Sequence, residues 1–215
     1  MRVTFAVTVL RGISERLISH IQADRMEKMD LLVNAVIEEL ERLKEGLDEI
    51  GKESSAQAKG RFEVWFPLLV DGLKRAERTR ARDRVTRIGL ILANALVSPP
   101  PIKSDNVEEM MRIAMELSDR DIYFLKELFK IEGDLVEMKG RIDRTSAWMI
   151  WANGPWGERV DGEIDSIFSK LESFGLAARL APPNNLTINA DFQNRYALLK
   201  KGLDFARFAT GSCGR

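Results

Sequence analysis

Residues 171–202 of this chain read LESFGLAARLAPPNNLTINADFQNRYALLKKG, a segment in which the spacing of apolar residues changes several times. Apolar residues at helical spacing over 164–174 predict a helix, and Gly175 suits its left-handed C-cap. Short strands and a last helix are predicted after it, at 176–180, 186–190, 195–199 and around Leu203–Phe208. The predicted order is therefore helix, strand, β-hairpin, helix.

This order is typical of a winged helix-turn-helix domain, and two motifs carry a resemblance to known proteins. Leu171-Glu-x-x-Gly-Leu176, followed by Tyr196-x-Leu198-x-x-x-Gly202, resembles the end of the recognition helix and the wing-to-helix passage of bacterial winged-helix proteins. The similarity covers Ser118–Ala209, and those proteins usually carry Thr where this chain has Leu199. The resemblance implies a mainly α protein with a C-terminal winged-helix domain, containing a small β-hairpin, over residues 104–215.

The N-terminal part carries a heptad pattern over 24–53 that predicts one long helical arm. Two packings are consistent with it: an antiparallel hairpin inside a helical bundle, or a coiled coil between two chains. Additional apolar residues widen the stripe, which favours the bundle. The heptad face consists of Met26, Met29, Val33, Val36, Leu40, Leu43, Leu47 and Ile50.

A second helical stretch is predicted over 62–96, with Pro67 either breaking it or starting a new helix. The prolines after Ser98 end this stretch, so we predict a helical bundle over 1–103. This part of the chain is similar to Abi-alpha-type abortive-infection proteins. The similarity rests on a charged helix that runs into Ile88–Leu96, a short loop, and a helix that ends at Leu117-Ser-Asp-Arg-Asp121. That similarity implies a role in bacterial phage defence and assigns no functional residue.

The total charge is zero, with 33 Lys and Arg against 33 Asp and Glu, yet the segments are strongly charged. Residues 74–87 have a net charge of +5, whereas the arm over 24–53 has −5. The basic segment therefore predicts contact either with the acidic arm or with an anionic partner such as nucleic acid or a lipid headgroup. Its cations are Lys74, Arg75, Arg78, Arg80, Arg82, Arg84 and Arg87.

The predicted recognition helix is a poor candidate for reading DNA, because residues 160–175 have a net charge of −3. Contacts to a nucleic-acid backbone are instead predicted for the wing, at Arg179, Arg195, Lys200 and Lys201. The aromatic cluster Trp148, Trp151 and Trp156 predicts a core or an interface.

Catalysis is not predicted. One His and one Cys exclude an intramolecular disulfide and a His/Cys metal cluster, and no phosphate loop or nucleophile elbow is present. Without a span or signal peptide, we expect a cytoplasmic bacterial protein with no cofactor and no metal. The expected function is regulation through protein contact or self-association in phage defence, and the alternative is a DNA-binding transcriptional regulator dimerised through its heptads.

Overall fold

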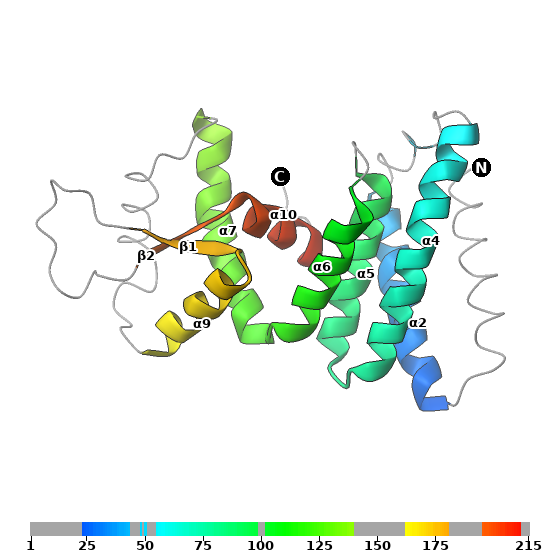
Figure 1. The fold of residues 1–215 in the computed structure, drawn as a ribbon, viewed down its shortest axis with the longest axis horizontal. Helices are drawn as coiled ribbons and strands as arrows, with labels where there is room; N and C mark the ends of the chain where they lie inside the picture. Colours follow the sequence, from blue (N-terminus) through cyan, green and yellow to red (C-terminus); the bar gives the residue numbers. More distant parts are fainter. Residues whose placement is uncertain are drawn as a thin grey trace, which may run out of the picture. The chain divides into compact units, whose positions relative to one another are not determined.

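The computed structural model describes residues 23–43, 48, 50, 55–98, 102–139, 162–180 and 195–211. In these ranges the protein is mainly α, with seven helices and a two-stranded antiparallel sheet near the C-terminus (Figure 1). The chain divides into two compact units, Met1–Glu116 and Leu117–Arg215, and each is described by itself.

The first unit contains helices α2 (Ala23–Arg42), α4 (Ser55–Arg78), α5 (Arg82–Val97) and α6 (Ser104–Glu116), with α5 packed against the other three. Figure 1 shows α4, α5 and α6 side by side. Because α5 has neighbours on several sides, Ile88, Ile91, Leu92 and Leu96 are all fully buried. This burial is what the apolar sequence of α5 predicts.

Gly89 brings α2 and α5 close together. A Cβ at this position would lie 2.7 Å from the Cβ of Ala35 on α2 and 3.1 Å from the carbonyl oxygen of Leu32. Only a residue without a side chain fits this crossing.

The heptad stripe packs inside the chain where the structure describes it, because α2 contacts α5 and α4. Its buried members are Met29, Val36, Leu40 and Ile50, while Met26, Val33 and Leu43 are half-buried and Leu47 lies outside the described residues. Leu32 and Ala35, off the strict heptad, are also buried, so the stripe is as wide as in a bundle. The single predicted arm is interrupted: α2 ends at Arg42 and Leu43 lies in a turn, whereas Asp48 and Ile50 are again helical.

The predicted second helical stretch also differs in detail. Helix α4 runs through Pro67, which neither breaks it nor begins a new helix. Pro67 is exposed, so water can satisfy the carbonyl that loses its hydrogen bond in the preceding turn. The stretch is instead interrupted at Thr79–Ala81, between α4 and α5.

Helix α6 packs against α4 and α5 and therefore lies in the first unit, although the predicted boundary at 103/104 precedes it. Its buried face consists of Val107, Met110, Met111, Ile113 and Ala114. The structure separates the two units after α6, between Glu116 and Leu117.

The second unit contains α7 (Asp119–Lys139), α9 (Gly162–Ser173), β1 (Ala177–Leu180), β2 (Arg195–Leu198) and α10 (Lys200–Ala209). Strands β1 and β2 pair directly, with Ala177 opposite Leu198 and Leu180 opposite Arg195. The predicted strand over 186–190 and the first twelve residues lie outside the described residues.

The predicted C-cap at Gly175 is confirmed, with φ of +67°. The Gly175 N–H donates to the Glu172 carbonyl (2.8 Å) and the Leu176 N–H to the Leu171 carbonyl (2.9 Å). This pair of bonds is a Schellman motif, which ends α9 and directs the chain into β1. Phe168 of α9 then stacks on Tyr196 of β2, with ring centroids 5.0 Å apart, and both side chains are buried.

Candidate interaction surfaces

The seven basic residues of Lys74–Arg87 do not lie on one helix. Because the chain breaks at Thr79–Ala81, they occupy the last turns of α4, the connecting turn and the first turns of α5. The Ala81 N–H donates to the hydroxyl of Thr79 (3.2 Å), a local bond that stabilises the turn. We refer to Lys74–Arg87 as the α4–α5 corner.

Three of these cations are bound within the unit. Arg87 is buried, and its guanidinium donates to the carbonyl of Ala114 near the end of α6 (3.3 Å). Arg75 pairs with Asp71 one turn earlier on α4, at 2.7 Å. Arg82 pairs with Glu27 of α2, which is a direct contact between the basic segment and the acidic arm.

A hollow of about 360 Å³ lies between the start of α2 and the α4–α5 corner. Glu27, Lys28 and Leu31 line it from α2, and residues 79–82 and Val85 line it from the corner. Its charged side chains belong to Glu27, Lys28, Arg80 and Arg82, so cations outnumber carboxylates there.

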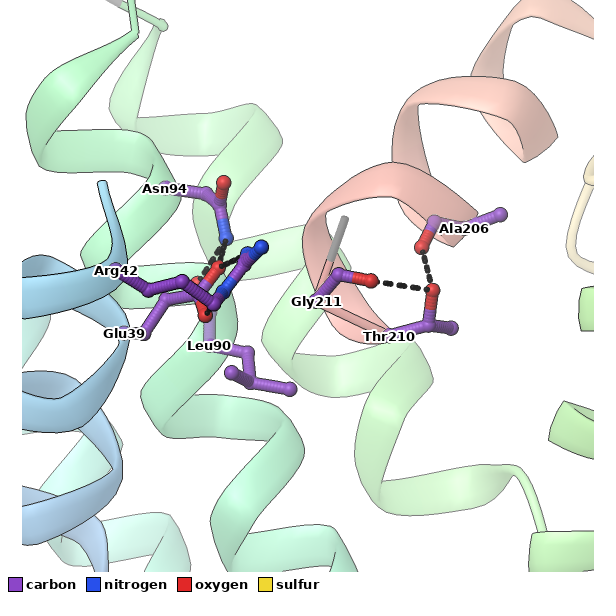
Figure 2. A network of polar contacts seen from close by, with 7 residues as sticks. All are labelled: Glu39, Arg42, Leu90, Asn94, Ala206, Thr210 and Gly211. Atoms are coloured by element: carbon purple, nitrogen blue, oxygen red, sulfur yellow. Dashed lines mark hydrogen bonds and ion pairs between the residues drawn. The ribbon is translucent and has the colours of Figure 1, made fainter. Parts of the chain in front are cut away.

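A buried carboxylate connects α2 to α5 at a second place (Figure 2). Glu39 is 4% exposed; it accepts from Asn94 Nδ2 of α5 at 2.9 Å and from Arg42 Nε at 2.7 Å. The hydrogen bonds to Glu39 raise the pKa of Arg42 above its ordinary value. Since both carboxylate oxygens have donors, we assign this group to helix packing rather than to chemistry.

An apolar groove of about 400 Å³ lies near the first half of α4, with Val64, Trp65 and Leu68 among its lining residues. Trp65 is fixed there, because its indole N–H donates to the carbonyl of Leu92 (2.8 Å). Arg61 is fixed as well, since it donates to the carbonyls of Leu96 and Ser98 at the end of α5. The groove is therefore lined by apolar surface and by polar groups already engaged in the fold.

In the second unit, Ser118 and Asp121 form a capping box at the start of α7. The Ser118 N–H donates to Asp121 Oδ2 (2.7 Å), and the Asp121 N–H donates to Ser118 Oγ (3.2 Å). Lys170 Nζ of α9 lies 2.7 Å from the same Oδ2. Burial raises the pKa of Asp121, but the hydrogen bonds from Lys170 and Ser118 outweigh it and the net shift is downward.

The predicted wing cations contact their own unit. Arg179 donates to the hydroxyl of buried Tyr196 (2.9 Å), and its guanidinium carbon lies 5.4 Å from that ring's centroid. Lys200 pairs with Asp204 at 2.7 Å, and Lys201 donates to the carbonyl of Phe174 at 2.8 Å. Arg195 lies in β2, and its side chain is outside the described residues.

The aromatic cluster Trp148, Trp151 and Trp156 lies outside the described residues. Where the structure describes the chain, no group of three or more His, Cys, Asp or Glu side chains is placed to hold a metal ion. None of the helices described is long and apolar enough to cross a membrane. Comparisons with protein-family models, curated proteins and solved structures found no match to this chain.

The sequence analysis did not predict the contact between Lys170, which is partly exposed, and the buried carboxylate of Asp121. The residues are 49 positions apart, and the only local signal was the capping box that contains Asp121. The sequence showed Lys170 as the sole base of an acidic helix, without indicating that it is directed into its own unit.

Proposed function

We propose that this protein is a non-enzymatic interaction and regulatory protein whose second unit is a winged-helix domain that contacts another protein. The order α9, β1, β2, α10 and the cap at Gly175 support this domain type. The role in bacterial phage defence rests on the resemblance to Abi-alpha-type proteins and is part of the same proposal.

The observation that carries the proposal is the ion pair between Lys170 and Asp121. Lys170 is the one basic residue of α9, and it is 2.7 Å from a carboxylate of its own unit. A recognition helix in the major groove presents basic or amide side chains to bases and phosphates. The exposed positions described on α9 are instead Ser166, Ser169, Glu172 and Ser173, which suit a protein partner better than a phosphate backbone.

Two further features support an interaction role. Arg179, Lys200 and Lys201 are each engaged within the unit, which lowers the positive charge available to a nucleic acid at the wing. The buried charged side chains in the described residues, Glu39, Arg87 and Asp121, have partners consistent with structural roles.

The proposal is tested by placing arginines on the exposed face of α9. A Ser166→Arg/Ser169→Arg variant of the full chain adds two bulky cations at positions three residues apart, on one side of the helix. If this face contacts a protein, these changes lower protection in a phage plating assay, and they raise binding to duplex DNA no more than the control variant does.

The matched control is Asn34→Arg/Asn106→Arg, which adds the same charge at exposed positions of the first unit. In the phage plating assay, this control variant should protect as well as the unmodified protein. If the α9 variant protected as well as the unmodified protein, the proposed contact surface would be contradicted. A gain in duplex binding larger than that of the control would favour the transcriptional-regulator alternative.

A further inference from the structure

Four cations of the α4–α5 corner, Lys74, Arg78, Arg80 and Arg84, have no ion pair or hydrogen bond from their side chains to any residue in the part of the chain that is described. Lys74, Arg78 and Arg80 are exposed and Arg84 is half-buried. The basic segment thus contains three cations that have partners within the unit and four that have none among the described residues, three of them exposed.

These four residues lie close to the turn that joins the end of α4 to the start of α5. Lys74 and Arg78 are one turn apart on α4, Arg80 lies in the turn, and Arg84 lies in the first turn of α5 (Figure 1). Helix α5 begins there without a side-chain cap at Ala81, so the positive end of its dipole adds to the same field.

The carboxylates at the corner only partly offset this charge. Glu27 is paired with Arg82, and Glu77 is half-buried with an interaction of its own. Asp83 is exposed in the first turn of α5 and subtracts one charge. Among the described residues, these four cations therefore outnumber the exposed carboxylate at the corner, although the whole chain has a net charge of zero.

We infer that the α4–α5 corner binds the phosphate backbone of double-stranded nucleic acid without reading its sequence. Three of the four free cations are arginines, whose planar fork binds phosphate oxygens in pairs. This inference concerns the first unit and does not rest on the function proposed for the second.

The surroundings favour a duplex over a single strand or a membrane. Residues 74–87 contain no aromatic side chain on which unpaired bases could stack. The large apolar side chains that are exposed in the described ranges are Val64, Phe66, Tyr123 and Leu199, none of them in the corner. Phe66 is roughly 18 Å from Arg78 along α4, so the corner offers no apolar group for insertion into lipid.

The test is fluorescence anisotropy of the full chain with a labelled duplex DNA of arbitrary sequence, at several salt concentrations. Four phosphate contacts predict a slope of log K against log salt of about −3.6, which is about a 150-fold loss of affinity between 50 and 200 mM salt. The variant Arg78→Gln/Arg80→Gln/Arg84→Gln should bind more weakly and reduce the slope to about −0.9. Since these side chains have no partner among the described residues, the variant should fold normally.

The matched control is Lys59→Gln/Lys103→Gln/Arg112→Gln, which removes the same charge from exposed positions of the first unit outside the corner. Its slope should equal that of the unmodified chain. The inference is overturned by any of three results: no binding of the duplex at 50 mM salt, equal losses in both variants, or binding to phosphatidylserine vesicles in place of the duplex.

Discussion

Replacing Gly202 with alanine tests the packing of α10 against Leu176, the residue that precedes β1. Gly202 is buried in the first turn of α10, and a Cβ built there would lie 1.9 Å from the carbonyl oxygen of Leu176. Real Cβ atoms essentially never come closer than 3.0 Å to such an atom, so α10 must move by about 1.1 Å, the difference between the two distances. The obstacle is backbone, which has no rotamer to change.

The same carbonyl accepts the N–H of Leu199 at 2.9 Å, and that bond is lost if the helix moves away. Losing it costs about 1–3 kcal/mol, and forced repacking about 1–3 kcal/mol more. The substitution also stabilises α10 by about 1 kcal/mol, because alanine is a better helix former than glycine. We therefore expect a net destabilisation of about 3 kcal/mol, or a fall of about 12–24 °C in the melting temperature of a unit of this size.

Calorimetry of the full chain measures the shift, and amide hydrogen exchange at Leu199 locates it in the second unit. The control is Gly60→Ala in α4, where no atom lies within 4 Å of the new Cβ. That change should stabilise the chain by about 1 kcal/mol. If Gly202→Ala were neutral or stabilising like the control, the close approach of α10 to Leu176 would be refuted.

Three further predictions concern buried polar groups. Lys170→Met leaves the buried carboxylate of Asp121 without its cation and should lower the free energy of unfolding, measured in urea, by about 2 kcal/mol. This loss is smaller than that for a fully buried ion pair, because Lys170 is partly exposed. The lowered pKa of Asp121 means that its contribution is complete above the unfolded value of 3.8 and is lost as the pH falls through the folded value. Asp121→Asn should therefore flatten the stability profile below about pH 4, and an unchanged profile would contradict this assignment. Arg87→Met keeps the aliphatic stem but removes the donor to Ala114, with an expected loss of about 2 kcal/mol by the same urea assay.

Local features were well predicted because short-range geometry decides them. The cap at Gly175 involves residues within a few positions of one another. The strands predicted at 176–180 and 195–199 match β1 and β2 to within one residue at each end. Such signals depend on one turn of backbone and need no information about distant neighbours.

Predictions failed where local signals were weak or misleading. Pro67 suggested a helix boundary, yet the exposed side of α4 tolerates it. The real interruption at Thr79–Ala81 contains neither Gly nor Pro, the residues that usually mark a break. The heptad pattern predicted a helix to residue 53, whereas α2 ends at Arg42.

By itself, the sequence determined that the chain is mainly α, that a pair of strands precedes the last helix, and that strongly charged segments cancel to zero. The sequence could not determine which charged side chains are paired, because no local signal distinguishes Arg87 from Arg84. Only the tertiary structure directs Arg87 to Ala114 and leaves Arg84 without a partner among the described residues. The reason is physical: periodicity depends on neighbours along the chain, whereas the pairing of a charge depends on which distant group packing brings within a few ångströms.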